Sequence, residues 1–365
     1  MTGASDAFAR SYAQARQNFL QAAEGAGLPV EAKPHPLPGL QGEPLAMDVA
    51  RDGHPDASRL LILSSACHGV EGYCGSGVQV TALRDQAFRA RAAEQGVAVL
   101  YVHGLNPYGF SHIRRATHEN VDLNRNFHDF SRPLPVNEAY RELHPLLVPQ
   151  QWPPGAENTR AIASYIEKKG EKAYQAAISG GQHEFPDGLF YGGRAPTWSN
   201  LAFREVLRAH GRRAARISWI DIHTGLGPSG VGERIYAGVN DPVAIARAKQ
   251  WWDGGGRTPV VSIYDGSSTS AVLTGLMFNA IYEECPQAEY TGLALEYGTQ
   301  PILQTFQALR GEQWLRLHPD APPALAQQIR QAVMDAFYTD TDAWRERIVA
   351  QAREALLQTV DGLAA

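Results

Sequence analysis

The amino-acid sequence predicts an α/β fold, a single domain with a mixed, largely parallel twisted sheet flanked by helices. Two apolar runs, 59–66 and 97–104, have the composition of buried strands, and a helical segment lies between them. A strand, a helix and a strand in this order form a parallel crossover unit. The 365 residues include 44% apolar and 19% charged residues, a balance that suffices for a sizeable buried core.

The other elements follow in chain order. Phe8, Tyr12 and Phe19 recur at helical spacing and predict an amphipathic helix over 5–25. Further predicted strands lie around 45–49, where we expect an edge strand, and at 216–224, 235–239 and 291–298; predicted helices cover 75–96, 159–177, 199–210 and the segment after Pro322. The segment 133–155 is Pro-rich and predicts a surface excursion. Because no repeat or clean linker interrupts the chain, we expect one catalytic domain over 1–365 with an N-terminal helix and a C-terminal helical extension.

Composition argues against several classes of protein. The net charge of −5 does not suit nucleic-acid binding. No secretory signal is visible, and no stretch reaches the ~18 apolar residues that a spanning helix needs. The three cysteines, Cys67, Cys74 and Cys285, are an odd number that suits a reducing compartment. We therefore expect a cytoplasmic protein with no nucleic-acid or membrane partner, and the oligomeric state stays open.

The first chemical motif is His68-Gly-Val-Glu71, which follows the strand at 59–66. A tight Gly-containing turn brings both side chains to one point, and two His plus one Glu is an established zinc ligand set. Alone, the motif also suits a helix start stabilised by a Glu in its first turn.

The second motif is Asp122-Leu-Asn124-Arg125-Asn-Phe, after Asn-Pro-Tyr-Gly and the pair Arg114-Arg115. As a simple alternative, such a polar run forms a turn and a solvated loop. However, a guanidinium beside amides suits bidentate recognition of a substrate carboxylate.

Two further side chains stand at predicted strand ends. His223 ends the strand at 216–224, and Glu296 lies near the end of the strand at 291–298. A strand histidine is more often a satisfied core residue, and a strand-end Glu can simply emerge into solvent. Burying a carboxylate in an apolar strand is costly unless the group is paired or functional. Open α/β sheets bind ligands at the carboxyl ends of their strands, so these positions favour a shared site.

In this order, the motifs resemble those of the zinc carboxypeptidases, and the sequence more closely resembles a bacterial branch of unknown function. The resemblance implies one Zn²⁺ per chain, held by His68, Glu71 and His223. It assigns Asp122 to orienting the first histidine, Asn124 and Arg125 to gripping the substrate carboxylate, and Glu296 to the general base. Arg115 matches the oxyanion-stabilising arginine, with Arg114 as an alternative.

The implied reaction is hydrolysis of an amide next to a free carboxylate by a zinc-activated water, with a peptide or an N-acyl amino acid as substrate. A carboxypeptidase is the first expectation, an aspartoacylase- or desuccinylase-like deacylase the second, and an inactive zinc-binding protein the third. The position that corresponds to the family's mobile Tyr falls near Thr274, so Tyr191, Tyr264 and Tyr282 are the alternatives. Gly225–Gly230 fits the pattern G-x-G-x-x-G, but an extended segment follows where a dinucleotide site needs a helix.

Overall fold

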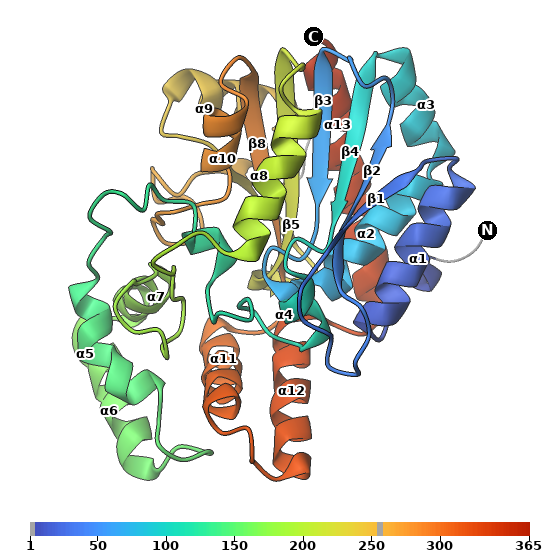
Figure 1. Ribbon diagram of the computed structural model, residues 1–365. Coiled ribbons are helices and arrows are strands. Elements are labelled where there is room, and N and C mark those ends of the chain that lie inside the picture. Colours follow the sequence, from blue (N-terminus) through green and yellow to red (C-terminus); the bar gives the residue numbers. More distant parts are fainter. Residues whose placement is uncertain (1–3, 254–257) are drawn as a thin grey trace.

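The computed structural model describes residues 4–253 and 258–365, which form a mixed eight-stranded sheet with helices on both faces (Figure 1). The strand order is β1-β2-β4-β3-β5-β8-β6-β7. The central strands β4, β3, β5 and β8 are parallel, whereas β1, β2 and β6 pair antiparallel with neighbours. The strands are β1 (Val30–Pro34), β2 (Ala46–Asp52), β3 (Arg59–Ser64), β4 (Val97–His103), β5 (Arg216–Ser229), β6 (Gly232–Tyr236), β7 (Val260–Val261) and β8 (Glu289–Gly298). The predicted fold class is confirmed.

The central strands are apolar throughout because both faces of the sheet are covered. In β3, Leu61 and Leu63 belong to one hydrophobic core, and Leu60 and Ile62 belong to the other. The first core packs against α1 (Tyr12–Gly25), α2 (Gly72–Arg84), α3 (Gln86–Glu94), α9 (Pro242–Trp252) and α13 (Asp342–Ala364). The second packs against α8 (Trp198–His210) and α10 (Asn279–Glu284).

A third group of helices lies beyond the carboxyl ends of β3 and β5, at the bottom of Figure 1. It consists of α5 (Glu138–Leu147), α6 (Ala156–Lys169), α7 (Glu171–Ser179), α11 (Ile302–Leu317) and α12 (Pro323–Phe337). Short helical turns, namely η1 (Ala4–Ala7), η2 (Gly69–Glu71), α4 (Pro107–Ser111) and η3 (Leu123–Arg125), complete the described elements. The residues that the sequence analysis places at the carboxyl ends of the strands therefore lie between the sheet and this layer of helices.

Some elements differ from the predictions for identifiable reasons. The helix expected at 75–96 is two helices, because the Asp85 carboxylate accepts a hydrogen bond from the Phe88 amide at 3.0 Å and starts α3. The helix expected at 159–177 breaks at Gly170, whose φ of 89° only glycine adopts readily.

The prediction of the edge strand was also wrong. The strand expected at 45–49 is the inner strand β2, and β1 forms the edge, where its terminal Pro34 is tolerated because the strand has only one neighbour. The sequence prediction missed α5 within the Pro-rich excursion and α11 before Pro322.

The glycine pattern at 225–230 lies within a strand and the turn that follows it. Strand β5 continues through Gly225 and Gly227 and is followed by β6, so no helix follows the glycine pattern there. No helix within 4–253 and 258–365 has both the length and the apolar composition for a membrane span.

Candidate metal centre

The turn after β3 brings His68 and Glu71 to one point. His68 has extended dihedral angles and precedes the short helix η2, which ends at Glu71. A side chain could not replace the hydrogen of Gly69, because a Cβ there would lie 2.0 Å from the main-chain carbonyl carbon of Gly109. The tight approach of the η2 and α4 backbones therefore fixes both side chains at the carboxyl end of β3.

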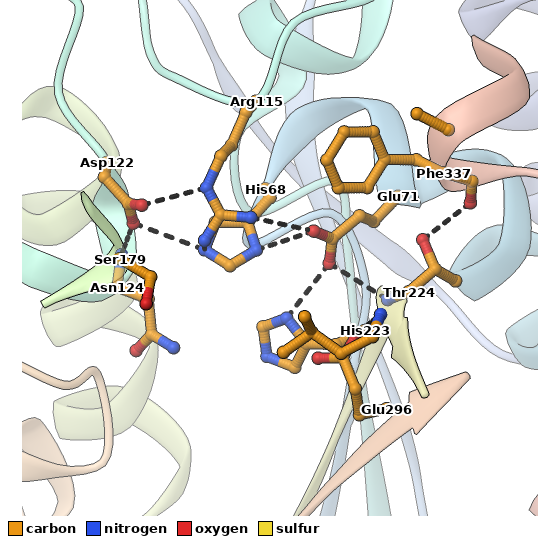
Figure 2. A network of polar contacts seen from close by, with 12 residues as sticks. His68, Glu71, Arg115, Asp122, Asn124, Ser179, His223, Thr224, Glu296 and Phe337 are labelled. Carbon is orange, nitrogen blue, oxygen red and sulfur yellow. Dashed lines mark hydrogen bonds and ion pairs between the residues drawn. The ribbon is translucent and has the colours of Figure 1, made fainter. Parts of the chain in front are cut away.

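His68, Glu71 and His223 form a buried group whose possible ligand atoms lie within 4.8 Å of one another. The Nδ1 atom of His68 lies 2.8 Å from Glu71 Oε1, and the Nδ1 atom of His223 lies 3.0 Å from Glu71 Oε2 (Figure 2). Two imidazoles and one carboxylate match the donor set of hydrolytic zinc sites, which leave a further position for water. The donor set therefore fits a zinc ion.

The outer nitrogen of each histidine faces a carboxylate. His68 Nε2 lies 3.2 Å from Asp122 Oδ1, and His223 Nε2 lies 2.7 Å from Asp221 Oδ2. A metal bound at Nδ1 requires the proton on Nε2, and such carboxylates hold the ring in that tautomer. Asp221 was missed in the sequence analysis. Its signal was present, because residues two apart on a strand share one face of the sheet.

A second buried group contains Cys67, Asp221 and His223. Burial and the neighbouring carboxylates raise the pKa of the Cys67 thiol well above its usual range. Since a thiolate is the form that binds metals, this environment disfavours Cys67 as a ligand.

Glu296 lies beside His223, because the two residues are paired in the parallel ladder between β5 and β8. One of its oxygens accepts a hydrogen bond from the Leu226 amide at 3.1 Å. Burial and the negative charge of Glu71 raise the pKa of Glu296 to about 8. By contrast, burial raises the pKa of Glu71 but the two histidines outweigh it, so the net pKa falls to about 2. The two glutamates thus differ strongly in their affinity for a proton.

The adjacent residues Arg114 and Arg115 point to different surroundings. Beside the histidines lies a cavity lined by His68, His223 and Glu296, and Arg115 also lines it. The Nε of Arg115 donates to Asp122 at 2.9 Å, and its Nη2 lies 2.7 Å from His68 Nε2 (Figure 2). Arg114 instead pairs with Glu312 of α11 and donates to Asn120 at 2.9 Å. The side chain beside the histidine–glutamate group is therefore that of Arg115.

Arg125 and Asn124 line the same cavity from η3. Arg125 is 3% exposed, and its guanidinium donates to the carbonyl oxygens of Ser179 (3.1 and 2.6 Å) and Asn124 (2.8 Å). Within the described ranges it makes no ion pair, and burial lowers its pKa. The Oδ1 atom of Asn124 accepts from the Met277 amide at 2.9 Å, which fixes the orientation of the side-chain amide.

None of the three tyrosines considered from the sequence lines this cavity. The Tyr264 hydroxyl donates to the Gly238 carbonyl at 2.8 Å, and the Tyr282 hydroxyl accepts from the Val239 amide at 3.2 Å. Tyr191 is buried, and its carbonyl accepts from the Asp122 amide at 2.7 Å. The tyrosine that does line the cavity is Tyr236.

Comparisons with known proteins agree with this fold. The sequence matches a family model described as "Protein of unknown function (DUF2817)" over residues 8–351. A comparison with curated protein sequences found no relative. Among solved structures, bovine thrombin-activatable fibrinolysis inhibitor in complex with tick carboxypeptidase inhibitor has a TM-score of 0.55 at 11% identity, covering 98% of both chains.

Two further solved structures are similar to this chain to a lesser degree. Thrombin-activatable fibrinolysis inhibitor by itself has a TM-score of 0.52 at 11% identity, covering 97% of this chain and 74% of that chain. A metallo-carboxypeptidase from Burkholderia cenocepacia has a TM-score of 0.44 at 12% identity, covering 96% and 68%. The resemblance predicted from the motifs is confirmed for the fold, which the two structures with TM-scores of 0.55 and 0.52 share, and for the family, which is one of unknown function.

Proposed function

The chain belongs to the DUF2817 family of proteins of unknown function, and we propose that it is a zinc-dependent hydrolase that cleaves an amide bond next to a free carboxylate. A metallocarboxypeptidase reaction is the form that the side chains support best. The proposal depends chiefly on one observation. The Nδ1 atoms of His68 and His223 both face Glu71. A second carboxylate, Glu296, which is not one of the proposed metal ligands, lies beside His223 on the next strand.

Each group of the site has a role in this reaction. Zinc, held by His68, Glu71 and His223, would supply Lewis acidity toward a water and a substrate carbonyl. Glu296 accepts the proton of the attacking water and then delivers it to the leaving nitrogen. In the metal-free protein, burial and Glu71 raise the pKa of Glu296 to about 8, so this carboxylate has a higher proton affinity than an ordinary glutamate.

Arg115 is proposed to stabilise the oxygen of the tetrahedral intermediate. Its guanidinium is fixed by Asp122 and Glu71, and it stacks over the Phe190 ring with 4.7 Å between the guanidinium carbon and the ring centroid. A donor that is already oriented needs no reorganisation as negative charge develops, which is the usual advantage of an oxyanion site.

Arg125 and Asn124 are proposed to bind the carboxylate of the substrate. A buried guanidinium that hydrogen-bonds to carbonyls and forms no ion pair in the described ranges is costly, because carbonyl dipoles do not cancel its charge. An anionic ligand would supply that charge. This requirement favours substrates with a terminal or amino-acid carboxylate over internal amides.

The test is hydrolysis by zinc-loaded protein of matched pairs of substrates, each with a free or an amidated carboxylate. We expect cleavage of the free acids with release of the C-terminal amino acid, and about 10- to 150-fold lower kcat/KM for the amides, because a charge-assisted contact contributes about 1.5–3 kcal/mol. Equal cleavage of both forms would contradict the role of Arg125. Failure to bind zinc would contradict the metal centre itself.

A deacylase that releases an acyl group from an amino acid uses the same groups and remains the second candidate. An N-acyl amino acid and a dipeptide added to the substrate panel separate the two, because a deacylase would cleave only the N-acyl amino acid, whereas a carboxypeptidase would also cleave the dipeptide. An inactive zinc-binding protein would bind zinc and cleave neither.

A further inference from the structure

The cavity lined by His68, His223 and Glu296 takes its apolar walls from two groups of elements, which we call its two compartments. One is walled by the sheet and the segment before α10, through Trp219, Ile235, Ile263, Leu276 and Met277. The other is walled by Phe306 and Leu309 of α11 and by Phe337 of α12. An amide bound at the centre would therefore have apolar surroundings on both sides of the bond that breaks.

The second compartment is closed by the helical layer beyond the sheet. Phe306 and Leu309 lie on α11 and are each 2% exposed, and Phe337 at the end of α12 is 1% exposed. Phe337 is fixed against the residues that follow His223, because its carbonyl accepts from Thr224 Oγ1 at 2.6 Å. In Figure 2, Phe337 and Asn124 lie on opposite sides of the histidine–glutamate group. The wall thus faces the part of a substrate that points away from its carboxylate.

The α11–α12 wall limits what this compartment holds, because Phe306, Leu309 and Phe337 are buried and close the cavity on that side. The rim is narrowed further, because the Gln175 side chain of α7 donates to the Thr269 carbonyl at 2.8 Å. A dipeptide-sized molecule therefore suits this site, whereas the acyl side of a longer, extended peptide would meet the α11–α12 wall.

The chemistry of the second compartment limits the acyl group. Among its lining residues from α11 and α12, Thr305 is polar, and its buried hydroxyl has no hydrogen-bond partner in 4–253 or 258–365. Of the lining cations, Arg115 is paired with Asp122, and Arg125 is reserved in the proposed function for the carboxylate beside the amide. A second carboxylate, as in a succinyl group, would lack an unpaired cation.

We propose that the substrate is a small amide with apolar groups on both sides of the scissile bond, such as an apolar N-acyl amino acid or dipeptide, and not the C-terminus of a protein. This inference rests on the proposed function. Water supplies a hydroxyl to the acyl carbon and a proton to the nitrogen as the C–N bond breaks, so the products are a carboxylic acid and a free amino acid. The α11–α12 wall selects against longer acyl portions.

The test compares kcat/KM of zinc-loaded full-length protein for four compounds: N-acetyl-phenylalanine, N-succinyl-phenylalanine, N-acetyl-arginine and an octapeptide ending in phenylalanine. We expect the first to exceed each of the others by at least about tenfold, since misfit groups in such pockets cost about 1–3 kcal/mol. Phe306→Ala and, separately, Leu309→Ala should raise the octapeptide value relative to N-acetyl-phenylalanine. The matched control is Leu303→Ala on the same helix, because Leu303 is 40% exposed and does not line the cavity.

The outcomes separate the two proposals. Octapeptide cleavage as efficient as that of N-acetyl-phenylalanine, or equal cleavage of the succinyl compound, would overturn the size and charge selection while leaving the hydrolase intact. No cleavage of any compound by zinc-loaded protein would overturn the hydrolase and this inference with it. Thermal unfolding of each variant shows whether it is folded, and either wall variant alone suffices for the comparison.

Discussion

At the metal centre, Arg115 donates to Asp122 and Glu71, whereas Arg125 in the same cavity donates to the main-chain carbonyls of Ser179 and Asn124. Both guanidiniums are largely withdrawn from water, but Arg115 has carboxylate partners and Arg125 has none in the described ranges. The comparison separates two kinds of buried cation. The charge of Arg115 is balanced by carboxylates of the protein, whereas Arg125 has only carbonyl partners and a Coulombic interaction with Asp122, which is compatible with its proposed role in binding a substrate carboxylate.

The largest effect on activity is expected from Glu296→Gln, beside the candidate metal ligands and Arg115. The amide keeps the shape but cannot accept the proton of the attacking water, so we expect kcat to fall about 10³-fold. Zinc content should be unchanged because Glu296 is not one of the proposed ligands. Steady-state kinetics together with metal analysis checks this, and full activity in zinc-replete variant protein would exclude Glu296 as the base.

Arg125→Lys tests the unbalanced cation and should have the next largest effect. Lysine keeps the charge but loses the fork that matches a carboxylate. We expect KM for free-acid substrates to rise about 30- to 100-fold with little change in kcat, because the lost contact is made in the ground state and in the transition state alike. Amidated substrates serve as the control, since their kinetics should not respond. A fall in kcat at constant KM would place Arg125 in the chemical step instead.

The two carboxylates behind the histidines permit a matched comparison. Asp122→Asn and Asp221→Asn each weaken the partner of one Nε2 atom, and such changes lower metal affinity about 10- to 100-fold. Zinc affinity measured by competition with a chelator should fall in both variants. If Asp221→Asn alone had no effect, the second histidine would not be held by Asp221.

The smallest effect concerns metal-free protein and its pH dependence. Burial and Glu71 raise the pKa of Glu296 from its ordinary value of 4.5 to about 8. At pH values between these two pKa values, the folded state therefore binds more protons than the unfolded chain. The contribution of Glu296 to the free energy of unfolding is therefore present at low pH and is lost as pH rises toward 8. The free energy of unfolding falls by at most about 1.4 kcal/mol per pH unit in this range.

Urea unfolding at several pH values measures this slope, and Glu296→Gln should remove that contribution. Added zinc should shift the titration of Glu296 to lower pH, because a nearby cation favours the carboxylate. A slope that survives in Glu296→Gln would have to arise from another group.

Local sequence patterns predicted the strands of this protein better than its helices. The strands that bear the site are continuous apolar runs, so β3, β4 and β8 were predictable within a few residues. In contrast, α11 begins soon after Glu296 and carries both polar and apolar side chains without a clear stripe, and its role as a cavity wall depends on where it folds back. The segment 75–96 was mispredicted because Asp85 can either continue a helix or cap the next one, and its hydrogen bond to Phe88 favours capping.

The sequence by itself determined the order of the site residues and their chemical types. His68, Glu71, Asp122, Arg125, His223 and Glu296 each follow or end a recognisable strand or motif, and their combination predicted a metal-dependent hydrolase. Which residues meet was decided by tertiary structure. The parallel ladder between β5 and β8 sets Glu296 beside His223, the ion pair with Glu312 turns Arg114 away from Arg115, and Phe306 and Phe337 close the cavity from helices far along the chain. These contacts join segments that are far apart in the sequence, so local periodicity and spacing cannot predict them.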